Sequence, residues 1–204
     1  MTANRQLIIK PLGLAAVYCI IVGIVTLYGY LSNTDGLLSI LPGYATTKPT
    51  TALCFLLTGI GLYINGAGNV VMQAIRKLCA ASVAIIGLSA LYLYISVSPL
   101  GWLDTLPFIS VEVQGRMSPM TAACFAVLGL TGLSLSKGLV TTGWRPVTLS
   151  LMLTVFSFIA TVADSLHGDY AMSLPTVTGF MVIAISLYRV SVILNDRYEQ
   201  EHLS

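Results

Sequence analysis

Charged residues are scarce in this sequence. Asp, Glu, Lys and Arg make up only 9% of the 204 residues, whereas 56% are hydrophobic. A soluble domain usually carries about 25% charged residues, so this chain cannot cover a globular fold with a surface that water solvates well. The formal net charge is only +2, and no stretch is dense enough in Lys and Arg to bind nucleic acid. The composition therefore excludes a soluble catalytic domain and a nucleic-acid-binding protein.

Motifs for metal binding and catalysis are also lacking. The four cysteines, Cys19, Cys54, Cys79 and Cys124, lie inside or at the edge of apolar runs, without a CxxC or Cys/His metal spacing. We expect them to be small buried hydrophobic residues. No Ser-His-Asp arrangement, phosphate-binding loop or pair of carboxylates emerges. The sequence predicts no enzyme, no catalytic residue and no metal site, and it identifies no cofactor.

Long apolar runs are what the sequence has instead. A helix of about 20 apolar residues spans a bilayer, and lipid offers backbone groups no partner outside the helix itself. The sequence therefore predicts an all-α membrane protein with six transmembrane helices within residues 1–198. Residues 195–204 form a cytoplasmic tail or begin a signalling helix. The six runs cover about 12–31, 50–64, 78–97, 119–136, 146–164 and 174–188.

Positive charge is distributed unequally between the two ends of these runs. Short loops rich in Lys and Arg stay in the cytoplasm, so both termini are predicted to be cytoplasmic and the protein to lie in the bacterial inner (plasma) membrane. The runs then pair into three hairpins of like orientation, over about 12–64, 78–136 and 146–194. The end that holds the termini carries Arg5, Lys10, Arg76, Lys77, Lys137, Arg145, Arg189 and Arg197, and the other end carries Lys48 and Arg116.

An internal threefold repeat marks the second helix of each hairpin. A proline opens each of these helices, and a threonine is followed by a phenylalanine four residues later and a small residue eight residues later. Such spacings lie along one side of a helix, and small residues let helices approach closely in lipid. We predict a packing face that joins three parallel hairpins. Its residues are Thr51, Phe55, Gly59, Thr121, Phe125, Gly129, Thr176, Phe180 and Ala184.

The same helix starts allow a second interpretation. Three helix N-termini bring three positive dipole ends to one depth. Together with the acidic residues of the outer loops, they would form a shallow polar site at the outer face.

Residues 116–130 carry a family resemblance. The string Arg-Met-Ser-Pro-Met-Thr-Ala-Ala-Cys-Phe at 116–125, continued by Leu-Gly-Leu at 128–130, resembles the N-terminal membrane sensory regions of many bacterial sensor histidine kinases and diguanylate cyclases. Residues 171–176 and 49–62 are similar to the last and first such helix openings. The resemblance implies repeated membrane hairpins that pass a signal to a cytoplasmic effector, and it specifies no ligand. The chain is then either the membrane module of a longer receptor or a relative that acts through another protein.

Four polar residues near the outer loops are candidates for sensing. Asp164, His167 and Asp169 lie together at the outer end of the fifth run, and neighbouring acids favour the protonated form of a histidine. The trio is therefore a candidate proton or ligand site, although zinc and haem normally recruit more ligands. The alternative is a solvated helix end. Arg116 binds an anionic ligand or pairs with an acidic residue of its own loop.

The leading hypothesis is a sensory or signal-input module that acts through its last helix. An accessory subunit of a larger membrane complex and a small transporter subunit are the alternatives; the absence of mid-span Gly/Pro breaks and of an intramembrane charge ladder weighs against transport. The expected partners are the lipid bilayer, a cytoplasmic effector or partner membrane protein, and a second copy of the chain in a homodimer. The stimulus is not indicated.

Overall fold

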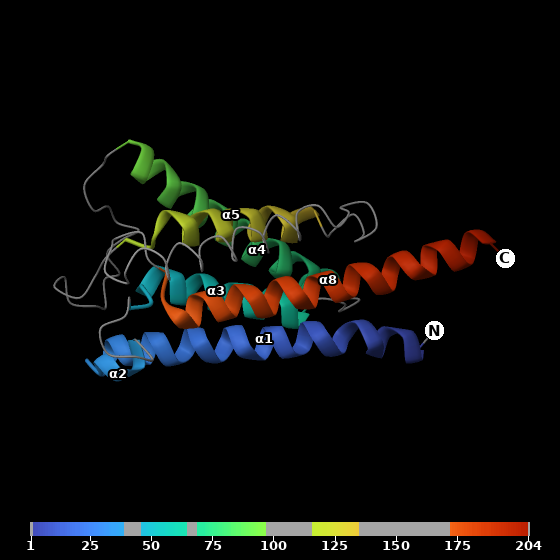
Figure 1. Cartoon of the computed structure of the whole chain (residues 1–204), viewed down its shortest axis with the longest axis horizontal. Helices are drawn as coiled ribbons and strands as arrows, with labels where there is room; N and C mark the ends of the chain where they lie inside the picture. The colour runs from blue at the N-terminus through green and yellow to red at the C-terminus, as the bar shows by residue number, and fades with distance from the viewer. Residues whose placement is uncertain (1, 39–45, 65–68, 97–115, 135–171, 204) are drawn as a thin grey trace.

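The described part of the chain is helical. The computed structural model describes residues 2–38, 46–64, 69–96, 116–134 and 172–203 (Figure 1), and no strand occurs within these ranges. The all-α prediction is confirmed for them. The fifth predicted run, over 146–164, lies outside the described residues. The helices are α1 (Thr2–Leu31), α2 (Asp35–Leu38), α3 (Pro49–Ile64), α4 (Val70–Ile95), α5 (Pro119–Ser134) and α8 (Leu174–Leu203).

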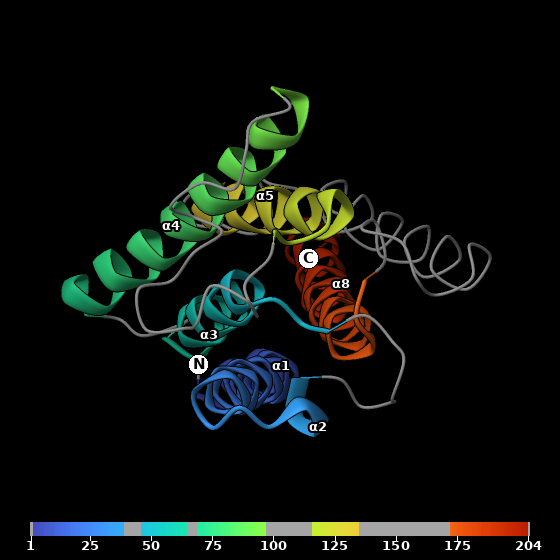
Figure 2. The ribbon, with the colours of Figure 1, turned by 90° about the vertical axis from the view of Figure 1, so that its left-hand side faces the viewer.

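Helices that are neighbours in sequence form the two most extensive contacts. α1 packs along α3, and α4 packs along α5, as expected for two helical hairpins. The hairpins meet where α3 lies against α4, and α8 packs against α1. Figure 2 shows α1, α3 and α8 nearly end-on, with α4 inclined to them. Both chain termini lie at the same end of the bundle (Figure 1).

Two helix starts differ from those predicted. α4 begins at Val70, eight residues before the predicted start, because the Asn69 side chain caps the helix by accepting from the Val71 N–H at 3.0 Å. Arg76 and Lys77 therefore lie in the helix rather than in a loop. α1 begins at Thr2, before the apolar run. α8 continues to Leu203, so residues 195–203 are helical, as in one of the two predicted alternatives.

Glycines bring the two helices of each described hairpin, α1–α3 and α4–α5, into backbone contact. A Cβ atom built on Gly23 of α1 would lie 2.8 Å from the carbonyl oxygen of Ala52 on α3. A Cβ on Gly87 of α4 would lie 2.8 Å from the carbonyl oxygen of Ala122 on α5. Real Cβ atoms do not approach so closely, so only glycine fits. This equivalence extends the internal repeat to α1 and α4, the first helices of the two described hairpins, where the sequence pattern alone does not reveal it.

Among the described residues, two helices are long and apolar enough to cross a membrane. They are Leu12–Leu31, within α1, and α4. The apolar helices Pro49–Ile64, Pro119–Leu133 and Leu174–Val190 are shorter. At 1.5 Å per residue, a helix of 16 residues is roughly 24 Å long, somewhat less than the ~30 Å thickness of a bilayer's hydrocarbon core.

The close approach of α5 to α4 gives a direct test. Gly129→Ala should lower the free energy of unfolding by about 1–3 kcal/mol, because overpacking forces the backbones apart; the added Cβ would overlap the backbone of Ala84. Gly61→Ala is the matched control, since its Cβ would meet only the Cys79 Cβ at an ordinary 3.6 Å. Unfolding in mixed micelles, followed by circular dichroism, measures both. Equal effects of the two substitutions would contradict this packing.

Candidate functional site

Three phenylalanines meet at the centre of the bundle, one from each predicted hairpin. Phe55 of α3, Phe125 of α5 and Phe180 of α8 are all buried. Their ring centroids are 5.1 Å apart for Phe55–Phe125, 5.4 Å for Phe55–Phe180 and 4.8 Å for Phe125–Phe180. The first and third pairs are edge-to-face, an arrangement worth about 0.5–1.5 kcal/mol beyond the buried area. This phenylalanine triad is where α3, α5 and α8 contact one another.

A layer of hydroxyl groups lies one helical turn before the triad. Thr51, Thr121 and Thr176 are buried. The Ser118 and Thr121 hydroxyls are hydrogen-bonded at 2.8 Å, and those of Ser173 and Thr176 at 2.7 Å. Each serine precedes the first residue of its helix and so occupies the cap position. These pairs satisfy polar groups where neither water nor lipid reaches them.

One hydroxyl contact links the first and last segments of the repeat. The Thr47 hydroxyl lies 2.6 Å from that of Ser173, and both residues are buried. The Tyr30 hydroxyl of α1 donates to the Thr47 carbonyl oxygen at 3.0 Å. The start of α8 is therefore attached to the segment that enters α3. The sequence indicates part of this hydroxyl layer, because a serine lies three residues before the repeat threonine in α5 and α8. In α3, Lys48 occupies that position instead.

The two glycines of the repeat, Gly59 and Gly129, pack within their hairpins rather than between hairpins. A Cβ on Gly59 would lie 2.8 Å from the Ala16 carbonyl oxygen of α1, and one on Gly129 would overlap Ala84 of α4. Successive helix positions turn by about 100°, so a residue eight positions on is rotated by about 80° from the first. The threonine and phenylalanine thus face the bundle centre while the glycine faces the hairpin partner. Ala184 of α8 is buried.

Arg116 lies against the C-terminal end of α4. Its guanidinium carbon is 5.2 Å from the centre of the Tyr94 ring, and it donates to the Leu93 carbonyl oxygen at 3.3 Å. The Tyr94 hydroxyl in turn donates to the Met117 carbonyl oxygen at 3.0 Å. Last-turn carbonyl groups of a helix have no partner within the helix, so these contacts give Arg116 a structural role.

The other predicted sensing residues, Asp164, His167 and Asp169, lie outside the described residues. Within the described part of the chain, no three His, Cys, Asp or Glu side chains gather in a way that could hold a metal ion.

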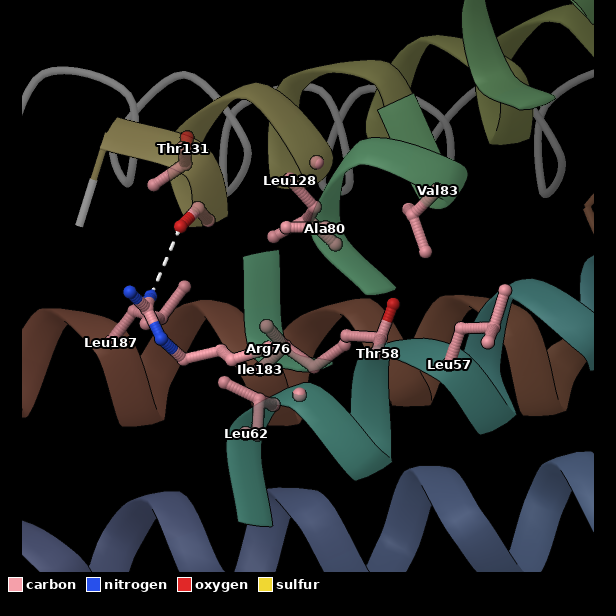
Figure 3. Close-up of a pocket in the computed structure, with 13 residues that line it drawn as sticks. Leu57, Thr58, Leu62, Arg76, Ala80, Val83, Leu128, Thr131, Ile183 and Leu187 are labelled. Atoms are coloured by element: carbon pink, nitrogen blue, oxygen red, sulfur yellow. Dashed lines mark hydrogen bonds between the residues drawn. The ribbon is translucent and has the colours of Figure 1, made fainter. Parts of the chain in front are cut away.

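A cavity of about 60 Å³ lies between α3, α4, α5 and α8. Figure 3 shows its walls, with α8 along one side and α5 opposite. Most of the lining is aliphatic, and the polar exceptions are Thr58, Arg76 and Thr131. The labelled lining residues are Leu57, Thr58, Leu62, Arg76, Ala80, Val83, Leu128, Thr131, Ile183 and Leu187.

The polar groups of the cavity differ in how they are paired. Arg76 is partly buried and donates to the Gly132 carbonyl oxygen at 3.2 Å. The Thr131 hydroxyl donates to the Val127 carbonyl oxygen at 2.7 Å. The enclosed Thr58 hydroxyl has no hydrogen-bond partner among the described residues, and an unpaired buried hydroxyl costs roughly 1–3 kcal/mol relative to a paired one. Sequence reasoning missed both Arg76, which it placed in a loop, and Thr58, whose position in an apolar run carries no signal.

A second contact that sequence reasoning missed joins α1 to α8. The hydroxyls of Tyr18 and Thr178 are 2.5 Å apart. Tyr18 lies in the middle of an apolar run, where the sequence alone does not reveal the partner.

Comparisons with protein-family models, with curated proteins and with solved structures found no match.

The unpaired hydroxyl of Thr58 leads to a stability prediction. Thr58→Val keeps the shape of the side chain and removes the buried polar group, so it should raise the free energy of unfolding by about 1 kcal/mol. Thr131→Val is the control, because the Thr131 hydroxyl has a partner, and it should not stabilise the fold. Unfolding in mixed micelles measures both. A Thr58→Val protein less stable than the unsubstituted chain would show that the hydroxyl is paired.

Proposed function

We propose that this chain is a membrane-embedded sensory or signal-input module. Six spans form three hairpins of like orientation in a bacterial inner membrane, with both termini in the cytoplasm. A stimulus at the outer face or within the bilayer changes the packing of α8, which passes the change to a cytoplasmic effector. The resemblance of residues 116–130 to the membrane regions of sensor histidine kinases and diguanylate cyclases supports this proposal.

The outward faces of the helices support residence in lipid. Large aliphatic side chains project from the bundle along the whole of α4: Val70, Leu78, Ile85 and Ile95 are between 62% and 82% exposed. Leu14 of α1 is 73% exposed. Water-soluble monomers rarely expose continuous apolar surface of this kind, whereas acyl chains solvate it without cost.

The position of α8 is the observation that carries the functional proposal. At its start, α8 is held by the Thr47–Ser173 contact and by Phe180 in the triad. At its end, the same continuous helix runs on to Leu203, past the bundle (Figure 1). A rigid helix transmits a shift or rotation along its length. A change in how the triad packs would therefore reach the C-terminal end of α8.

Accessibility labelling tests the proposed topology. In a variant whose four native cysteines are replaced, Lys48→Cys should react with a membrane-impermeant maleimide on intact cells, because its segment is outside. Lys77→Cys should react only after the membrane is permeabilised, because Lys and Arg clusters stay inside. The Lys77 side chain is exposed on the surface of the chain, so packing within the protein does not block its reaction. Reaction of Lys77→Cys on intact cells would contradict the topology.

A fusion tests signal output. The chain joined in frame after Ser204 to a histidine kinase or cyclase domain should show altered output when Phe180→Ala is introduced. Losing ring contacts worth about 1 kcal/mol shifts a two-state equilibrium by roughly fivefold. Met181→Ala, at the neighbouring and more exposed position, should leave output unchanged at equal membrane level. Equal output from both variants and the unsubstituted fusion, with the fusions inserted in the membrane, would refute a signalling role for α8.

A further inference from the structure

The cavity between the hairpins combines an apolar wall with one cation. Leu57, Val83 and Leu128 line it from α3, α4 and α5, and α8 contributes Ile183 and Leu187. The cation is that of Arg76, which lies near the start of α4. Gaps left by imperfect packing in a membrane bundle are expected to be wholly apolar. A cavity with a guanidinium and an unpaired Thr58 hydroxyl on its walls has the composition of a binding site instead.

The volume of the cavity restricts the ligand. The cavity measures about 60 Å³, less than half of the roughly 150 Å³ of an engineered protein cavity that binds benzene. A ring cofactor, a haem or a quinone head therefore does not fit without rearrangement. The end of a single alkyl chain does fit, and its methylene groups match the aliphatic wall.

Arg76 determines the charge of the ligand. A guanidinium carries five N–H donors in a planar fork. One hydrogen bond, from Nη1 to the Gly132 carbonyl oxygen, is made within the described residues, and no carboxylate of that part of the chain pairs with Arg76. A carboxylate or phosphate group binds such a fork through two parallel hydrogen bonds. Arg76 lies close to the helix ends that the charge bias places in the cytoplasm, at the depth of lipid head groups.

We propose that this cavity binds a single-chain amphiphile, whose anionic head pairs with Arg76 and whose alkyl end enters between α3, α5 and α8. The proposal rests on the proposed sensory function, because it assigns the ligand class to that function. Ile183 and Leu187 form part of the wall, so an inserted chain presses on α8 one to two turns beyond Phe180. Occupancy of the cavity and the packing of the triad are thereby coupled.

Binding of decanoate to the purified chain in phosphatidylcholine nanodiscs tests the proposal, with decanol as the neutral probe. Arg76→Gln should weaken saturable decanoate binding by about tenfold, the effect expected for one charge-assisted contact. Lys77→Gln is the matched control, because it removes the same charge from an exposed neighbour, and it should leave binding unchanged. Decanol should bind more weakly than decanoate, and equally to the unsubstituted and Arg76→Gln chains.

A second pair of variants tests where the alkyl chain lies. Val83→Phe fills the cavity and should abolish saturable binding, whereas Ile85→Phe, at a position 62% exposed on the same helix, should not. Val83→Ile repeats the test with one added methylene and should weaken binding. The proposal would be overturned if Arg76→Gln and Lys77→Gln weakened decanoate binding equally. It would also be overturned if a folded Val83 variant bound decanoate as the unsubstituted chain does. Nanodiscs containing phosphatidylglycerol test the restriction to a single chain: competition with decanoate would show that a two-chain bilayer lipid occupies the cavity and would overturn it, and unchanged decanoate binding supports a single-chain amphiphile.

The two proposals fail separately. If decanoate binds as described but leaves the output of the fused effector unchanged, the sensory function fails and the cavity assignment stands. If the fused effector responds to Phe180→Ala but decanoate does not bind, only the cavity assignment fails.

Discussion

The contact among Phe55, Phe125 and Phe180 is the interaction on which the rest of this bundle depends. Inside lipid, apolar side chains gain nothing from leaving one apolar solvent for another, so helix association relies on packing geometry and on polar contacts. Three rings whose centroids lie 4.8–5.4 Å apart supply that geometry. They also bring together one helix from each predicted hairpin, so no hairpin can move without changing the triad.

Much of this arrangement follows from the sequence, because it repeats. The spacing of the threonines and phenylalanines is sufficient to place Thr51 and Phe55 on one helix face, and the apolar runs predict the described helices. The roles of the glycines are harder to assign: the spacing groups Gly59 and Gly129 with the phenylalanines, but their rotation about the helix axis turns them toward the hairpin partner. α4 begins after the cap formed by Asn69. In the sequence, the charges of Arg76 and Lys77 favour a loop more strongly than a single asparagine favours a helix start.

The cavity could not be predicted, since it arises from how hairpins pack. In the sequence, the position of Arg76 indicates a cation in a loop, and Thr58 is one residue of an apolar run. Only the approach of α5 and α8 places these two side chains on one cavity wall. Along α8, the hydroxyl layer, the triad and the cavity follow one another in that order. α8 therefore contacts all three and then runs on at the end of the bundle that holds both chain termini (Figure 1).

A double-mutant cycle between Phe55 and Phe125, measured as reversible unfolding in lipid-like micelles, tests the role of the triad most directly. Phe55→Leu and Phe125→Leu, made singly and together, should show a coupling energy of about 0.5–1.5 kcal/mol. In a control cycle, Tyr63→Leu at an exposed position replaces Phe55→Leu and is combined with Phe125→Leu. This cycle should show no coupling energy. Additive losses for Phe55 and Phe125 would mean that the rings do not hold the hairpins together, and would contradict the central role of the triad in this bundle.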